Sequence, residues 1–208
     1  MVNTNRTHAT NGDIGYGMPL DKRQDFYITF SVRGNYHQNA DLSHINATTE
    51  KGGLLQQYGI TPNAKLRGAI GNNFRFSTSW RTSFSTIKQN NMDTRYRETK
   101  LSADFSWNLP WKFQLASDFC ANIYNGFADA SINKAHCQWN ASLARCFLSD
   151  QLSVKLIANG ILTPNNNIYS SINATSRVES YTDILPRYFM LSVVYSLDWT
   201  QKSKRNTK

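Results

Sequence analysis

Apolar and polar side chains alternate with a period of two along residues 74–87, and this alternation constrains the fold more than any other feature of the sequence. The even-numbered positions hold Phe, Trp and Thr, whereas the odd-numbered positions from 75 to 85 hold two arginines and four serines. A β-strand turns successive side chains to opposite faces. The segment is therefore predicted to be a strand with one apolar face and one polar face.

The same period recurs in eight other segments: 13–20, 25–37, 57–71, 95–109, 112–124, 134–147, 152–159 and 187–197. Pro62 is expected to weaken its strand locally because proline has no N–H for the ladder, and Pro110 is expected to end a strand. The connections at 20–25, 71–74, 109–112 and 147–151 are short. Those at 39–53, 89–94, 125–132 and 160–183 are longer or more polar, and we interpret them as loops.

Short and long connections thus alternate along the chain. Bacterial outer-membrane barrels have this asymmetry, with short turns on the periplasmic side and longer loops outside, whereas a soluble meander has no reason to sort its connections. The mean hydropathy of −0.52 and the lack of any long apolar run exclude a helical membrane protein. Barrel strands remain compatible with this composition because each of them is only half apolar.

The polar faces hold mostly Ser, Thr, Asn and Gln, while the outer face of a soluble sandwich is highly charged. Aromatic residues gather near strand ends, as interfacial girdles require. These patterns predict an all-β fold, an antiparallel up-and-down transmembrane β-barrel. Since bacterial barrels have even strand numbers, nine segments indicate a partial barrel of about 8–10 strands. Residues 1–199 are expected to form this C-terminal part of a larger barrel, followed by a basic tail at 200–208.

The alternation assigns side chains to lipid or to the lumen. The lipid-facing set is expected to be Phe74, Phe76, Trp80, Phe84, Phe105, Trp107, Phe113, Phe119, Trp139, Phe189, Leu191 and Tyr195. Arg145 falls on this face near a strand end, from which a long side chain reaches the interface. Substrate-binding candidates on the lumen face are Arg33, Arg75, Arg81, Asp104 and Asp118. Both acids are expected to pair with an arginine such as Arg75 or Arg81, and the arginines themselves equally fit an electrostatic ladder of a polar lumen.

Signatures of other function classes do not occur in the sequence. The net charge of +9 is scattered over the strands without a nucleic-acid-binding motif, so no nucleic acid partner is expected. The cysteines Cys120, Cys137 and Cys146 have no metal-site spacing, the four histidines have no carboxylate or cysteine at ligand spacing, and no G-x-S-x-G occurs. We therefore expect no metal, no cofactor and no enzyme activity. Residues 1–7 have no apolar signal core, so the export signal of a barrel is expected elsewhere, in a longer protein.

The C-terminal third resembles a known family. Residues 147–156 read FLSDQLSVKL, residues 159–162 read NGIL, and residues 186–197 read PRYFMLSVVYSL. These segments are similar to the end of TonB-dependent outer-membrane receptors, above all to the Bacteroidota outer-membrane β-barrel family. The resemblance implies a barrel around an N-terminal plug, placed in the cell outer membrane, that imports a siderophore, vitamin or glycan. It also implies contacts with membrane lipid and the barrel-assembly machinery.

This chain contains neither the plug nor the TonB box of that family. Contacts with TonB and a surface lipoprotein are therefore expected through parts that this chain lacks. Loops 39–53 and 160–183 are expected to contribute to substrate capture. Two alternatives stay open at this point: a structural or adhesive outer-membrane barrel without transport, and a soluble β-barrel that binds a small ligand.

Overall fold

The computed structural model describes residues 7–41, 53–89, 92–127, 133–162, 168–172, 177–181 and 187–197. Almost all of them are in β-strands, and in these ranges no helix has the length and apolar character needed to cross a membrane. The elements are β1 (His8–Pro19), β2 (Phe26–Asp41), β3 (Gly53–Ile70), β4 (Phe74–Gln89), β5 (Met92–Leu109), the 3₁₀ turn η1 (Pro110–Lys112), β6 (Phe113–Asn125), β7 (Ala135–Phe147), β8 (Leu152–Asn159), β9 (Ile168–Ile172), β10 (Arg177–Tyr181) and β11 (Tyr188–Tyr195).

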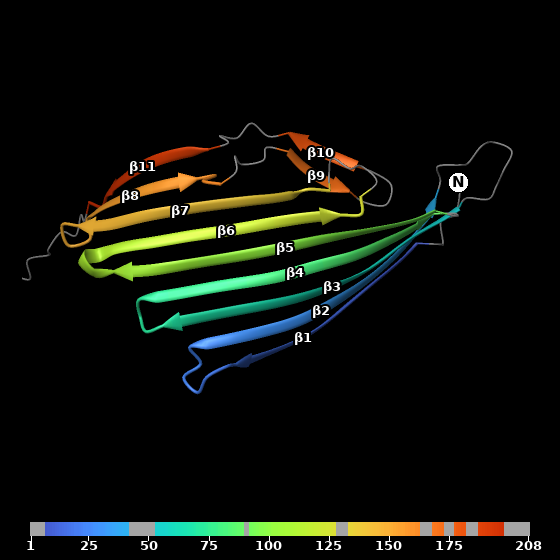
Figure 1. Ribbon diagram of the computed structural model, residues 1–208, viewed down its shortest axis with the longest axis horizontal. Coiled ribbons are helices and arrows are strands. Elements are labelled where there is room, and N and C mark those ends of the chain that lie inside the picture. The colour runs from blue at the N-terminus through green and yellow to red at the C-terminus, as the bar shows by residue number, and fades with distance from the viewer. Residues whose placement is uncertain are drawn as a thin grey trace, which may run out of the picture.

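Nine of these strands form one antiparallel sheet in the order β1-β2-β3-β4-β5-β6-β7-β8-β11 (Figure 1). They correspond to the nine segments of alternating polarity, so the all-β antiparallel prediction is confirmed. Each strand pairs with its sequence neighbour, except that β11 joins β8 after the β9–β10 hairpin. The sheet is not closed, because β1 and β11 are its two edges rather than partners.

Two predicted connections differ from the structure. The span 160–183, interpreted as one loop, contains β9 and β10, which pair with each other in a separate two-stranded sheet. The span 89–94 contracts to residues 90 and 91, because β4 and β5 continue pairing as far as Gln89 and Met92. In both cases the backbone ladder extends through polar residues, whose strand character the apolar alternation does not register. Most of the proposed capture loop 39–53 and the tail 200–208 lie outside the described residues.

The short turns gather at one end of the sheet, on the left of Figure 1, and we call this the turn end. It holds the connections 20–25, 71–73, 110–112 and 148–151. The opposite end, which we call the loop end, holds the connections 42–52, 90–91 and 126–134 and the route from β8 to β11. The sorting of the connections between two ends is thus as predicted, although the β4–β5 connection is as short as any turn.

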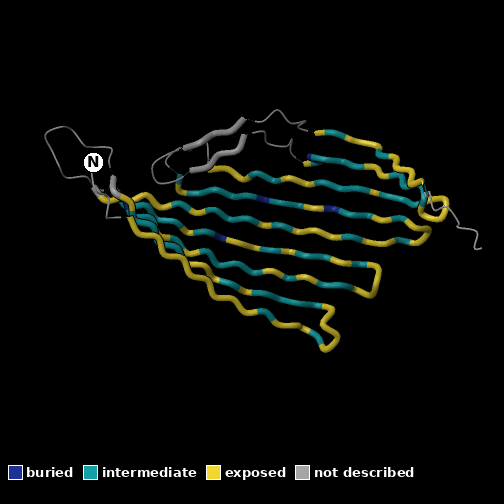
Figure 2. The backbone as a smooth tube through the Cα atoms, turned by 180° about the vertical axis from the view of Figure 1, so that it is seen from behind, coloured by how far each residue is buried: buried dark blue, intermediate teal, exposed yellow. Residues whose placement is uncertain are grey.

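The nine strands lie in a single curved layer, which both views display (Figure 2). Because no described element covers either face, the sheet has almost no core. The buried hydrophobic residues in the described ranges are Leu55 and Ala121, whereas Phe189 is 73% exposed and Trp80 is 42% exposed. A soluble sandwich would bury such side chains between two sheets.

Pro62 interrupts one ladder, as the sequence predicts. β3 pairs with β2 without a break from Gly53 to Gly68, including Val32 opposite Pro62. On its other side the pairing with β4 passes from Ile60–Phe84 directly to Asn63–Arg81. The missing proline N–H explains this gap.

Candidate functional site

The strand register brings the apolar residues of all nine strands onto one face of the sheet. One row across the sheet runs Phe26, Gly68, Phe76, Phe105, Ser117, Ala141, Ala158 and Phe189. The next row toward the turn end contains Ile70, Phe74, Trp107, Leu115, Leu143, Leu156 and Leu191. All twelve side chains assigned to lipid by the alternation lie on this face, which we call the apolar face.

Aromatic rings contact one another along the apolar face. Phe74 lies next to Phe105 and Phe76, at centroid distances of 6.0 and 6.1 Å, and meets Trp107 edge-on at 6.1 Å. Gly68 makes room for this packing, because a Cβ at that position would lie 2.6 Å from the Phe76 ring and 2.7 Å from the Phe26 ring. The rings therefore form a continuous apolar surface and not isolated exposed residues.

Several hydroxyl groups on the apolar face form hydrogen bonds within the sheet. Ser117, only 8% exposed, donates to the backbone oxygen of Asn140 at 3.0 Å and accepts from the indole N–H of Trp139 at 2.8 Å. Thr82, 3% exposed, pairs with Thr99 at 3.1 Å. Thr78 donates to the carbonyl of Ser102 at 3.1 Å. These groups need no water, which is the condition for placing them in hydrocarbon.

The opposite side, which we call the polar face, holds all five lumen candidates. Arg75 and Arg81 lie on β4, Asp104 on β5, Asp118 on β6, and Arg33 on β2 nearer the loop end. Lys65 and Arg67 of β3 and Lys100 of β5 share this face with them. The charges are concentrated on β3, β4 and β5, where lysine and arginine outnumber acids.

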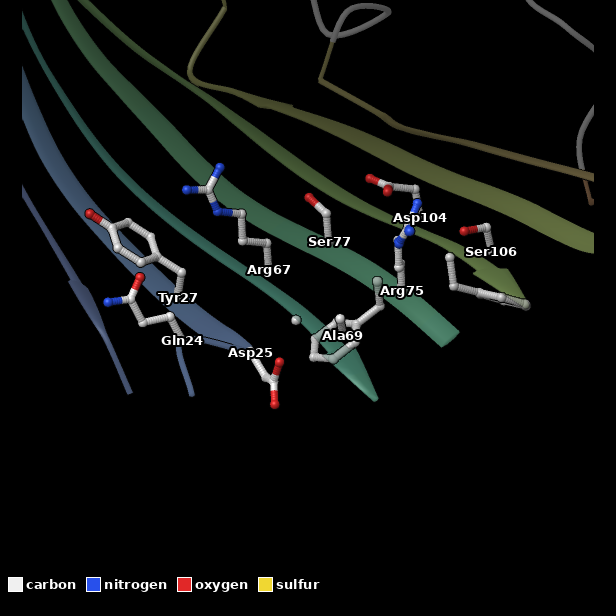
Figure 3. Close-up of a pocket in the computed structure, with 12 residues that line it drawn as sticks. Gln24, Asp25, Tyr27, Arg67, Ala69, Arg75, Ser77, Asp104 and Ser106 are labelled. Atoms are coloured by element: carbon white, nitrogen blue, oxygen red, sulfur yellow. The ribbon is translucent and has the colours of Figure 1, made fainter. Parts of the chain in front are cut away.

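A hollow of about 650 Å³ lies on the polar face near the turn end. Figure 3 shows side chains from β2, β3, β4 and β5 rising around it on one side of the sheet. Its lining from the polar face consists of Tyr27, Arg67, Ala69, Arg75, Ser77, Asp104 and Ser106, with Gln24 and Asp25 from the adjoining turn. The lining also includes Gly68, Phe76 and Phe105, which the register assigns to the apolar face.

Within the hollow, the guanidinium carbon of Arg67 lies 4.7 Å from the centre of the Tyr27 ring, opposite which it stands in the register. This stacking orients the guanidinium without neutralising it. The hollow brings together two of the five predicted residues, Arg75 and Asp104. Arg33, Arg81 and Asp118 lie outside it.

The expected pairing of the two acids with arginines does not occur among the described residues, whose ion pairs are Lys88–Asp93 and Lys112–Asp150. Asp118 instead accepts a hydrogen bond from the side-chain amide of Asn140 at 2.7 Å. The register also sets Asp104 directly opposite Asp118, and Arg81 directly opposite Lys100. Like charges placed directly across a strand pair destabilise a sheet, so stability does not account for their arrangement.

Sequence reasoning missed Tyr27 and Arg67 as site residues. The alternation does place both on the polar face, but their meeting depends on the lateral register of β2 against β3. The alternation alone does not fix that register, because a shift by two residues leaves every side chain on the same face. In the described ranges no group of three His, Cys, Asp or Glu residues is arranged to hold a metal ion.

Comparison with known proteins gives no match, whether with protein-family models, with curated proteins or with solved structures. The function is therefore inferred from the geometry of the two faces.

Proposed function

We propose that this chain is part of the wall of an outer-membrane β-barrel, and that the barrel belongs to a TonB-dependent transporter that imports a nutrient. The observation that carries the membrane assignment is the apolar face, which is continuous over nine strands and which no other described element covers. Lipid is the cover that such a surface needs, because exposed apolar patches of this extent are rare on soluble monomers.

The dimensions of the apolar face suit a bilayer. Phe74 and Phe84 mark its two ends on β4 and lie ten residues apart. At a rise of about 3.4 Å per residue they are about 34 Å apart along the strand. A strand tilt of about 45° reduces this to about 24 Å, close to the apolar band of about 25 Å in outer-membrane barrels.

The ends of this band carry the residues that suit an interface. Toward the loop end, Tyr58 lies on the apolar face with the Lys88 ammonium 5.7 Å from its ring centre. Toward the turn end stand Trp107, Phe113 and Phe147. Aromatic and basic side chains are enriched where hydrocarbon meets headgroups.

Strand directions add a condition on the complete barrel. β1 and β11 are the first and ninth strands of an antiparallel sheet, so they run in the same direction. Direct pairing of these edges would be parallel. An all-antiparallel barrel that includes this sheet therefore contains an odd number of further strands, which gives the even total usual for bacterial barrels.

Transport is supported by the polar face. Its charges lie around a hollow, and opposed like charges such as Arg81 and Lys100 are retained against their cost to stability. Such an arrangement suits a lumen that meets polar or charged solutes. We propose a TonB-dependent transporter rather than another class of barrel because residues 147–197 resemble the end of TonB-dependent receptors.

A quenching experiment tests the membrane assignment. The full chain is inserted into vesicles whose acyl chains are brominated at mid-depth, and tryptophan emission is measured for the wild type and for Trp80→Phe and Trp139→Phe. We expect strong quenching that weakens in both variants, because both indoles lie on the apolar face. Emission that is insensitive to bromine would overturn the assignment.

A soluble ligand-binding barrel is the alternative from another class. It requires that a further layer cover the apolar face, and it predicts a monodisperse protein in buffer without detergent. A structural barrel without transport would lie in the membrane in the same way. The coding region upstream of Met1 distinguishes such a barrel from a transporter. An encoded plug domain would support transport, whereas a signal peptide followed directly by strands would contradict transport.

A further inference from the structure

Arg145 is a charged residue in the middle of an apolar neighbourhood. On β7 it stands opposite Phe113 of β6 and Val154 of β8, both on the apolar face. It lies two residues before Phe147, the last residue of β7, and so close to the turn end. The row next to it, toward the middle of the band, contains Leu115, Leu143 and Leu156.

Two phenyl rings hold the guanidinium group in place. Its central carbon lies 4.7 Å from the centre of the Phe113 ring and 4.7 Å from the centre of the Phe147 ring. The Nε atom is covered by protein and has no hydrogen-bond partner among the described residues. Stacking on aromatic rings fixes the plane of a guanidinium and leaves its charge in place.

No carboxylate neutralises this charge within the described part of the chain. The acid of the adjoining turn, Asp150, is already engaged by the Lys112 ammonium at 2.8 Å. A cation beside hydrocarbon is stable only where an anion or water meets it. Where the apolar band ends, the anions at hand are the phosphates of lipid headgroups.

We propose that Arg145 binds the phosphate of a phospholipid whose acyl chains lie on the adjacent leucine row. This rests on the proposed function, since it needs the apolar face to meet lipid. The planar fork of arginine suits two phosphate oxygens. Trp111 of η1, which contacts β7 and is 80% exposed, adds an amphipathic ring at the same end of the sheet. The leucine row favours a lipid over free phosphate, because inorganic phosphate has no acyl chain to contact the leucine side chains.

Lipid retention measured by native mass spectrometry tests this site. The full chain in detergent is mixed with phosphatidylglycerol, with phosphatidylcholine or with a phosphate-free diacyl glycolipid of the same chain length. We expect both phospholipids, and not the glycolipid, to be retained. Arg145→Leu is expected to reduce retention roughly tenfold, the effect of losing one charge-assisted contact.

Lys155→Leu is the matched control, because Lys155 is exposed on the polar face of β8, one residue beyond the partner of Arg145. Equal losses in Arg145→Leu and Lys155→Leu would overturn the site in favour of general charge attraction. Equal retention of the glycolipid, or displacement of the lipid by excess inorganic phosphate, would overturn it as well.

Arg145→Lys guards against a folding defect, since it keeps the charge and removes the planar fork. It is expected to retain less lipid than the wild type and more than Arg145→Leu, with unchanged heat-modifiable gel mobility in all three proteins. If bromine quenches the tryptophans but Arg145→Leu retains lipid normally, the lipid site at Arg145 is wrong and the membrane assignment stands. If bromine does not quench the tryptophans, the membrane assignment itself is wrong.

Discussion

The two faces of the sheet treat polar groups in opposite ways. On the apolar face, Ser117 and Thr82 are almost completely buried and find their hydrogen-bond partners within the sheet. On the polar face, Arg81 and Lys100 stand directly opposite each other without an acid partner among the described residues. The difference shows that one face is arranged to do without water, while the other depends on it.

The largest effect is expected when a charge is placed on each face in turn, at neighbouring positions of β4. Trp80→Lys puts an ammonium near the middle of the apolar face, and we expect a loss of about 2–4 kcal/mol in the free energy of unfolding. Ser79→Lys, one residue away on the polar face, is expected to be mild. Denaturant unfolding of both variants in lipid vesicles measures the difference. Equal losses would contradict the division into two faces.

A smaller effect is expected from the removal of one hydroxyl group. Ser117→Ala leaves the Trp139 indole N–H without its acceptor on the apolar face, and we expect a loss of about 1–2 kcal/mol. Ser79→Ala is the control, because Ser79 bonds Ser102 at 2.6 Å on the polar face, where water replaces a lost partner. The same unfolding assay compares them, and a control that costs as much as Ser117→Ala would show that water does not replace the lost partner on the polar face, which contradicts the contrast between the faces.

Relief of like-charge repulsion on the polar face is expected to stabilise the protein. Lys100→Gln removes the cation opposite Arg81, and we expect a gain of about 0.2–1 kcal/mol, which declines as salt is added. Unfolding at low and high ionic strength measures it. A loss of stability at low salt would mean that Lys100 has an attractive partner.

The smallest effect is expected at the turn end. Lys112 and Asp150 form an ion pair at 2.8 Å, but both side chains are more than half exposed. We expect Lys112→Ala to lower the unfolding free energy by at most a few tenths of a kcal/mol, because water and salt screen such pairs. A loss as large as that of Ser117→Ala would show that the pair is shielded, and so that lipid or another segment covers the turn end.

The alternation of side chains was sufficient to predict the strands and the sorting of residues between the faces, because it depends only on the local backbone. The hollow was not predictable in this way, since Tyr27 and Arg67 meet through the exact register between β2 and β3, which the alternation does not give. The short connection at 147–151 was predicted, but the backbone conformation of Leu148, Ser149 and Asp150 was not. All three residues have positive φ, although none is glycine. The β9–β10 hairpin was missed because its strands are short and polar.

The gap that Pro62 leaves between β3 and β4 has a consequence for the mechanics of the wall. Across the gap, Thr61 donates a side-chain hydrogen bond to Ser83 at 3.1 Å, while Thr82 is tied to Thr99 on the other side of β4. Hydroxyl groups thus replace the backbone ladder at one point. Water competes for this Thr–Ser hydrogen bond more readily than for the backbone ladders on either side, so the wall is expected to be weakest against lateral separation at this point.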